Sequence, residues 1–307
     1  MGEAEKKSVG NMAVSAVILS KPGIITSVAF TGLAGMVIAS RALPSGQAIL
    51  LCVASLLLSA GGAAILNNLL DKKIDRQMSR LNKRVEALRV LGDRNAWVIS
   101  ILMMVAALFI SFSYFNYVNA ALILLAILSY TLIYTLFLKR TSPFGTVLGG
   151  IPGALPVLIG YTAIKPVPQL DAIIVFVFMM LWQPPHFWVL AQKYRKDYEK
   201  AGINVLPVAL GTKYTNMLIL IYSLSLIPLT FILWLTGTNT VYFAAFAAIS
   251  GIYFNYLVVR SVFANRGYGK AFSASIIYML LIMLGIVVDI LVKSLSPVER
   301  VIGALLR

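Results

Sequence analysis

The chain alternates between long apolar segments and short polar ones. A helix needs roughly 20 predominantly apolar residues to cross a bilayer, and nine segments meet that length. They lie at 22–40, 46–69, 96–115, 117–137, 144–163, 168–192, 215–236, 241–263 and 270–293. Because most connections between them are short, the pattern predicts an all-α polytopic membrane protein. We expect a single transmembrane domain over residues 1–307, with residues 1–20 as a polar tail.

Composition supports a bilayer as the solvent. Hydrophobic residues make up 60% of the 307 residues and charged residues 12%, with a mean hydropathy of +0.88, which excludes a soluble domain of this size. The N-terminus has two Glu residues ahead of its lysines and no small-residue cleavage site, so we expect no removable signal peptide. Cys52 is the only cysteine, which excludes an internal disulfide and a cysteine-based metal site.

The basic residues behind the net charge of +15 are concentrated in alternate loops along the chain. Of the 26 Lys and Arg residues, 21 lie before the first apolar segment or after segments two, four, six and eight. By the positive-inside rule this bias predicts a plasma-membrane protein with a cytoplasmic N-terminus and an external C-terminus. It explains the charge without nucleic acid, and the basic loops can also contact anionic membrane lipid. The other five basic residues are Arg41, Lys165, Lys293, Arg300 and Arg307.

The polar segment after the second span, AILNNLLDKKIDRQMSRLNKR at 64–84, concentrates acidic residues. Spacings of three and four place Asn68, Asp71 and Asp75 on one helix face, with Asn67 one position off it. Two carboxylates at this spacing repel each other, and Mg²⁺, which binds carboxylates and substrate phosphates together, is a reason to keep them adjacent. We therefore predict a magnesium and diphosphate site. Positive charge for the anion follows at Arg80, Lys83 and Arg84.

The alternative is that Asp71 and Asp75 form a solvated face paired with Lys72, Lys73 and Arg76. The metal is favoured because the acids stand where a helix leaves the bilayer, beside two Asn residues and a basic run.

A second unusual segment, LWQPPHFWVLAQKYRKDYEKAGINVLP at 181–207, follows the sixth span. His186, the only histidine, lies four residues after Trp182 and beside a Pro pair that should kink the helix. Ionisable residues within spans usually face a cavity or a partner, and the aromatic residues nearby indicate the wall of a pocket for a large flat ligand. A neutral histidine bonded across helices is the alternative.

Further residues on the same side can approach a diphosphate. Tyr194, Lys196 and Asp197 follow the sixth span, and topology permits them to meet the first polar segment. Lys139 and Arg140 end the fourth span. Gly145, Gly149 and Gly153, each four apart, are typical of a helix packing face.

Three segments together resemble the UbiA superfamily of intramembrane prenyltransferases: NNLLDKKIDRQMSRLNKR, KRTSPFGTVLGGIPGALPVLIGY and WQPPHFWVLAQKYRKDYEKAGINVLPV. The resemblance covers most of residues 20–215. It implies a nine-helix bundle whose central cavity opens toward the cytoplasm. Asn68, Asp71 and Asp75 resemble the family's catalytic metal and diphosphate ligands, and Tyr194 and Asp197 its second polar motif.

The closest branch of that superfamily implies an activity. A farnesyl group would pass from farnesyl diphosphate to a vinyl group of heme b, with Mg²⁺ as cofactor, and water would then add to give heme O. Trp182 and His186 would contact heme, while Arg80, Lys83, Arg84, Lys139, Arg140 and Lys196 would hold diphosphate. A downstream heme A synthase or terminal oxidase assembly would be a partner.

One departure bears on the acceptor. Many superfamily members have a second Asp four residues after the first in the second motif, whereas Ala201 stands there in this chain. This favours the heme branch over the quinone-type aromatic prenyltransferases, and a member that prenylates a quinone precursor, a lipid or a chlorin is the alternative within the superfamily. A transporter or a heme-binding membrane protein is the alternative from another class. It is disfavoured because both polar motifs lie on one side and no inverted repeat is visible.

Overall fold

The computed structural model describes the backbone of residues 3–295 and the side chains of residues 10–295, and it is helical throughout that range. Arg300 and Arg307, used above to assign topology, lie outside the described residues. The long helices are α2 (Pro22–Ser40), α3 (Gly46–Leu70), α6 (Asp93–Tyr114), α7 (Tyr117–Leu128), α10 (Ile151–Thr162), α11 (Leu170–Lys193), α14 (Gly211–Leu235), α15 (Val241–Phe263) and α16 (Tyr268–Leu295).

The prediction of nine spans is confirmed. Within residues 3–295, nine segments are long and apolar enough to cross a membrane, and each overlaps the corresponding sequence segment. The fourth span combines α7, a π-helix η2 (Ser129–Leu138) and α8 (Lys139–Thr141), and the fifth combines α9 (Gly145–Leu148) with α10. Their outer surface is apolar: Phe112 is 70% exposed and Ile249 is also 70% exposed, as expected for side chains that face lipid.

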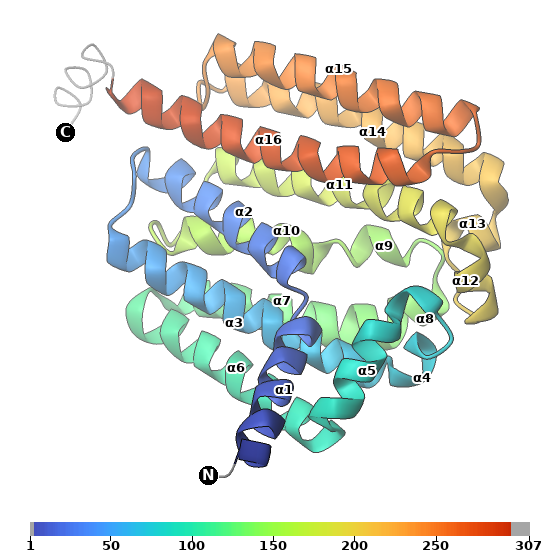
Figure 1. The fold of residues 1–307 in the computed structure, drawn as a ribbon. Helices are drawn as coiled ribbons and strands as arrows, with labels where there is room; N and C mark the ends of the chain where they lie inside the picture. The colour runs from blue at the N-terminus through green and yellow to red at the C-terminus, as the bar shows by residue number, and fades with distance from the viewer. Residues whose placement is uncertain (1–2, 296–307) are drawn as a thin grey trace.

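The spans form a bundle of two groups (Figure 1). Helices α11, α14, α15 and α16 pack against one another, and α3 packs against α6. Helices α2 and α10 join the groups and pack so closely that a Cβ added at Gly160 would lie 1.8 Å from the carbonyl oxygen of Gly32. Small residues permit this approach, as is common between membrane helices.

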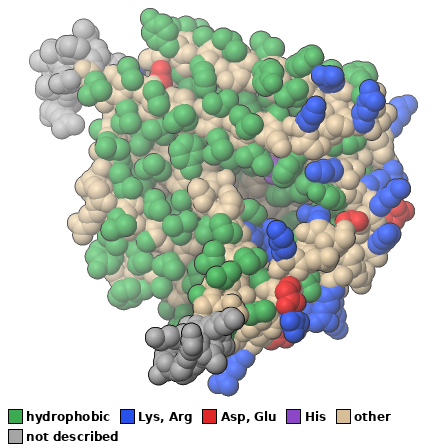
Figure 2. Space-filling model, in the orientation of Figure 1, with side chains coloured by type: hydrophobic (Ala, Val, Ile, Leu, Met, Phe, Trp, Pro, Cys, Tyr) green, Lys and Arg blue, Asp and Glu red, His purple; other side chains and the backbone are tan. Residues whose placement is uncertain are grey.

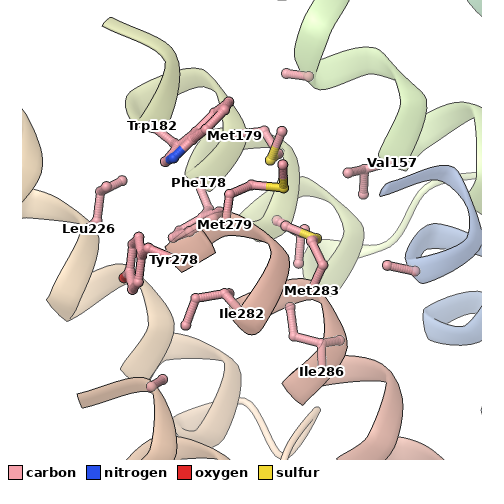
Figure 3. Packing of buried hydrophobic residues seen from close by; sticks show 14 of the residues in the cluster. Val157, Phe178, Met179, Trp182, Leu226, Tyr278, Met279, Ile282, Met283 and Ile286 are labelled. Atoms are coloured by element: carbon pink, nitrogen blue, oxygen red, sulfur yellow. The ribbon is translucent and has the colours of Figure 1, made fainter. Parts of the chain in front are cut away.

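Methionine and aromatic side chains fill the centre of the first group. Figure 3 shows Phe178 and Trp182 of α11 near Tyr278 and Met279 of α16, and Met283 of α16 and Val157 of α10 belong to the same cluster. Each of these side chains is buried. The packing fixes α11 against α16, which positions the histidine discussed below.

The remaining short helices gather at one end of the bundle (Figure 1). Their bounds are α4 (Lys72–Asp75), η1 (Ser79–Leu81), α5 (Asn82–Leu91), α12 (Arg195–Lys200) and α13 (Leu206–Ala209). Residues 1–20, expected as a tail, instead contain helix α1 (Glu3–Leu19), whose last residue, Leu19, packs with Ala87, Leu88 and Leu91 of α5. The apolar face of α5 explains this, because it needs a covering helix.

The glycines after the fourth span serve packing, as the sequence predicts. A Cβ at Gly145 would meet the carbonyl of Leu138, and one at Gly149 would meet the ring of Tyr134. A Cβ at Gly153 would meet the side chain of Gln183.

Candidate active site

Asp71 lies at the end of α3 and is 1% exposed. Its Oδ2 accepts hydrogen bonds from Lys139 Nζ at 2.6 Å and from Asn67 Nδ2 at 3.0 Å. Arg140 Nη2 lies 3.6 Å from the other carboxylate oxygen, Oδ1, which is buried and has no hydrogen bond. The buried carboxylate therefore has positive charge from the end of the fourth span beside it, and one oxygen available to a ligand.

Asn67 connects this carboxylate to the start of the first span. Its Oδ1 accepts from Lys21 Nζ at 2.6 Å, and its Nδ2 also donates to Thr135 Oγ1 at 3.0 Å. Lys21 reaches Tyr130 OH at 3.2 Å as well. The backbone of Lys21 is left-handed, with φ of 59°, which turns the chain between α1 and α2. A lysine from outside the span is thereby placed inside the site.

Burial, helped by repulsion from Arg84 and Lys139 and opposed by attraction to Asp75 and Asp71, lowers the pKa of Lys21 from 10.5 to about 7. From the sequence, Lys21 is only one of the basic residues that set the predicted topology. Its position directly before Pro22, as the basic residue nearest an apolar segment, was the available signal.

The π-helix η2 supplies Tyr130 and Thr135 to the same place. Within it, Thr135 Oγ1 donates to the carbonyl of Tyr130, five residues back, at 2.8 Å. π-helical turns are rare and are frequent at functional sites. Here the wider turn brings both side chains toward Asn67 and Lys21, an arrangement that apolar periodicity does not reveal.

Asn68 and Asp75 lie beside the Asn67 network, and Asp75 is close enough to Lys139, Asp71 and Lys21 to interact with their charges. They line a pocket of about 280 Å³ whose walls include Arg76 and Arg84. Asn68 Nδ2 donates to the carbonyls of Leu19 and Ala64, while its Oδ1 is buried without a partner. Burial raises the pKa of the Asp75 carboxyl, with nearby Lys139 opposing the shift.

This geometry corrects one detail of the predicted face. Helical spacing places Asn68 with Asp71 and Asp75, but the amide that contacts the Asp71 carboxylate is that of Asn67. The reason is that Asn67 and Asp71 are themselves four residues apart, so the last turn of α3 brings their side chains together. A metal-ligand role for Asn68 remains a prediction.

The polar segment after the second span contacts the polar segment after the sixth span. The topology predicted from the sequence allowed this contact but did not require it. Arg80 Nη2 donates to Tyr198 OH at 2.8 Å, and its guanidinium lies 5.1 Å from the ring centre of Tyr194. Ser79 Oγ donates to Asp197 Oδ2 at 3.3 Å. Beneath these contacts an apolar cluster joins the segments, formed by Met78, Leu81 and Ile203 with Ala201 packed against it. The residue at the place of the missing second Asp thus has a packing role.

The predicted basic residues differ in position. Arg84 is partly buried in the pocket wall, and burial lowers its pKa, with Asp75 opposing the shift. Lys83 and Lys196 are exposed, and neither has a hydrogen bond or ion pair to another residue in the described part of the chain. The structure brings Lys139, Arg140, Arg80 and Arg84 to the site, and leaves Lys83 and Lys196 on the surface.

His186 and Trp182 lie on α11, about 10 Å from its polar end by the helical rise. Their rings are stacked with centroids 4.6 Å apart, and both side chains are less than 10% exposed. Figure 2 shows histidine within a hollow of one face of the molecule, with Lys and Arg side chains nearby. Aromatic side chains therefore surround His186, and their role as the wall of a ligand pocket stays a prediction.

The side-chain donors around Asp71 and Asp75 suit a hard cation better than a transition metal. Within the described residues, no group of three or more His, Cys, Asp or Glu side chains could hold a metal ion. What is available is oxygen: the unpartnered Oδ1 atoms of Asp71 and Asn68 are buried, and Asp75 is near them. Mg²⁺ binds through one or two carboxylates plus substrate phosphates and water, so these residues fit it.

The chain belongs to the UbiA prenyltransferase family, because the model of that family matches residues 28–276. It is a multi-pass membrane protein of that class. The curated relatives over most of its length are named protoheme IX farnesyltransferase. One, from Geotalea uraniireducens (strain Rf4), is 42% identical and covers 83% of this chain and 98% of its own. Another, from Aquifex aeolicus (strain VF5), is 38% identical and covers 91% and 96%.

Solved structures confirm the fold. A digeranylgeranylglyceryl phosphate synthase has a TM-score of 0.75 at 19% identity, covering 91% of this chain and 98% of its own. A UbiA homolog from Aeropyrum pernix K1 has a TM-score of 0.72 at 18% identity, covering 88% and 98%. A UbiA homolog from Archaeoglobus fulgidus, bound to DMAPP and Mg²⁺, has a TM-score of 0.63 at 14% identity, covering 90% and 99%.

Proposed function

We propose that this chain is a protoheme IX farnesyltransferase that acts as one domain and converts heme b to heme O. Relatives of that name at 42% and 38% identity, aligned over most of both chains, support the assignment. The structural observation that carries it is the pairing of two features: a charged cluster around buried Asp71, and an aromatic-walled hollow containing His186. The first suits a diphosphate and the second a flat macrocycle.

The charged cluster would hold farnesyl diphosphate. Asp71 and Asp75, with Asn68 or Asn67, would bind Mg²⁺, in keeping with the UbiA homolog structures that contain Mg²⁺ and a prenyl diphosphate. When bound, Mg²⁺ offsets the charge of the diphosphate and of the leaving group. Lys139 already lies 2.6 Å from Asp71.

The chain's own cations would act on the leaving group. As the C1–O bond breaks, negative charge grows on the diphosphate, and donors fixed in a site of low dielectric stabilise that change more than water does. Lys21 and Lys139 are held in place before the reaction by their hydrogen bonds to Asn67 and Asp71. Arg80 and Arg84 would add donors from the segment after α4.

The bond changes balance without a protein nucleophile. C1 of the farnesyl group forms a bond to the terminal vinyl carbon as diphosphate leaves, and the positive charge moves to the carbon next to the porphyrin. Water supplies a hydroxyl group to that carbon and a proton is released. The apolar wall around Trp182 would keep water from the allylic cation until the vinyl carbon has reacted.

The positive-inside bias supports an orientation in which the charged end faces the cytoplasm. The N-terminus would then be cytoplasmic and the C-terminus external. A heme A synthase or a terminal oxidase assembly pathway would receive the product.

The test uses purified full-length protein in detergent with farnesyl diphosphate, heme b and Mg²⁺. Chromatography with mass detection is expected to show heme O, and no product under conditions where the protein binds both substrates would refute the proposal. Parallel reactions with a quinone precursor and a lipid acceptor test the other UbiA chemistries. Geranylgeranyl diphosphate tests the choice of prenyl chain.

A further inference from the structure

The imidazole of His186 is held more firmly than a packing role requires. It lies between two rings nearly parallel to it: Trp182 at 4.6 Å and 21°, and Phe272 of α16 at 4.6 Å and 25°. Trp182 Nε1 donates to the carbonyl of Ser275 at 2.8 Å, which joins α11 to α16 beside the ring. These contacts fix the plane of the imidazole.

Ser275 also sets which ring nitrogen carries the proton. His186 Nδ1 lies 2.7 Å from Ser275 Oγ, and that hydroxyl lies 2.7 Å from the carbonyl of Phe272. Serine hydroxyls in helices commonly donate to a carbonyl three or four residues earlier, and this contact assigns the single hydroxyl hydrogen of Ser275 to the carbonyl of Phe272. The hydroxyl oxygen must then accept from His186, which places the ring proton on Nδ1. The lone pair of a neutral imidazole is therefore on Nε2.

Nε2 is the atom without a protein partner. It has no hydrogen bond to any of the residues the structure describes. It is also not fully enclosed by protein atoms. Histidine lies in the hollow visible in Figure 2. An imidazole whose Nδ1 donates to an oxygen and whose Nε2 has no protein partner is the arrangement that histidine metal ligands adopt.

We propose that His186 Nε2 coordinates the iron of the heme substrate, and that Ser275 is a positioning residue that orients the ring and fixes its proton. The inference rests on the proposed function for the identity of the ligand. An axial bond at the iron leaves the peripheral vinyl groups free, since they lie at the edge of the macrocycle. It would place the iron at the level of His186, about 10 Å from the polar end of α11, deeper than the charged cluster.

This placement accounts for how one cavity serves two unlike substrates. The diphosphate is held at the polar end by Asp71, Asp75 and their basic neighbours, so its prenyl chain must extend into the bundle. Iron coordination would anchor heme at one point and restrict the macrocycle to a plane across that axis. The vinyl group then has a defined position relative to C1, which is what reaction without a protein nucleophile needs.

The test is heme binding by full-length protein in detergent, with ferric heme b as the probe. Wild-type protein is expected to show the absorption and electron paramagnetic resonance signature of a histidine-ligated iron. In His186→Ala that signature should be lost, and the Kd for heme should rise at least about tenfold. Because an alanine variant can misfold, His186→Gly with added imidazole is the second variant, and free imidazole should restore the signature.

Ser275 is tested with a matched pair on one helix. Ser275→Ala removes the acceptor for Nδ1–H and should weaken heme binding about 10- to 100-fold and shift the iron–imidazole stretching frequency of the ferrous complex. Ser275→Thr keeps a hydroxyl and should retain both. Ser273 is exposed and bonds only the carbonyl of Gly269, so Ser273→Ala should match wild type.

The outcomes separate the inference from the proposed function. Heme O production together with an unchanged heme signature in His186→Ala would overturn iron ligation and leave the function standing. A Ser275→Ala variant that behaves like Ser273→Ala would overturn the positioning role. Asp71→Asn, expected to be inactive, should bind heme with the wild-type signature. A histidine-ligated complex in a protein that makes no heme O would instead refute the function and support the ligation.

Discussion

Replacing Lys21 with methionine is expected to stabilise the ligand-free protein while weakening its binding of farnesyl diphosphate. Lys21 is 9% exposed, and burial lowers its pKa to about 7. A lysine with a lowered pKa is more easily charged in the unfolded chain than in the folded one, so its charge disfavours folding. Methionine has a similar length and no charge to desolvate.

The size of the effect follows from the two pKa values. A difference between 10.5 and about 7 corresponds to about 5 kcal/mol of lost folding free energy below pH 7. Methionine would also leave Asn67 Oδ1 without its donor, at a cost of about 1–3 kcal/mol. We therefore expect a net stabilisation of about 2–4 kcal/mol at pH 6.

The pH dependence has a definite sign. Between pH 7 and 10.5 the unfolded lysine keeps its proton and the folded one does not, so wild-type stability should rise with pH over that range. Lys21→Met should lack this rise. Thermal unfolding from pH 6 to 9.5, followed by tryptophan fluorescence, measures both effects, and Lys213→Met at an exposed position is the control.

Binding should change in the other direction. Loss of a buried cation from the proposed diphosphate site should raise the Kd for farnesyl diphosphate at least about tenfold, as expected for a hydrogen bond to a charged group. A Lys21→Met protein that melts below wild type at pH 6, or that keeps the wild-type rise in stability with pH, would refute the reasoning.

Three other changes test the site and the fold. Asp71→Asn should lower turnover at least about a hundredfold in the chromatographic assay, because the neutral amide cannot hold the metal; wild-type turnover would remove Asp71 from that role. Gly160→Ala should lower thermal stability by about 2–3 kcal/mol, since its Cβ would meet a backbone carbonyl of α2 at 1.8 Å, whereas Gly46→Ala, with open space, should not. Arg80→Met should raise the Kd for farnesyl diphosphate about tenfold by titration calorimetry, and Arg266→Met, at an exposed position outside the pocket, serves as the control.

The sequence predicted the spans because a bilayer imposes a simple rule. Any segment that crosses must be about 20 residues long and apolar, so hydropathy alone located all nine. The same rule has little to say about residues 1–20 or 82–91. There α1 and α5 form because their apolar faces cover each other, and neither face is apparent until both helices are present.

The sequence pointed to the acidic residues of the candidate site but not to the contacts that join them to other segments. Asp71, Asp75 and Lys139 stand out as charges at the ends of apolar segments. Lys21 does not, because it reaches the site only through a left-handed turn before α2. The contact between Arg80 and Tyr198 joins residues 118 positions apart, and no local pattern encodes such a contact.

The interactions that remain unmade at this end of the bundle point to a ligand. Asp71 Oδ1 and Asn68 Oδ1 are buried without hydrogen bonds, and each such group costs about 1–3 kcal/mol. Lys21 adds a buried charge close to them. Replacing these groups with apolar residues would favour the ligand-free fold, so stability cannot be the reason that they occur together. The magnesium-bound diphosphate proposed above would satisfy all of them at once, because the metal would take the oxygens and the anion would take the lysine. The stability that the ligand-free protein loses to these unpaired groups is then the free energy spent on arranging the site for its substrate before binding.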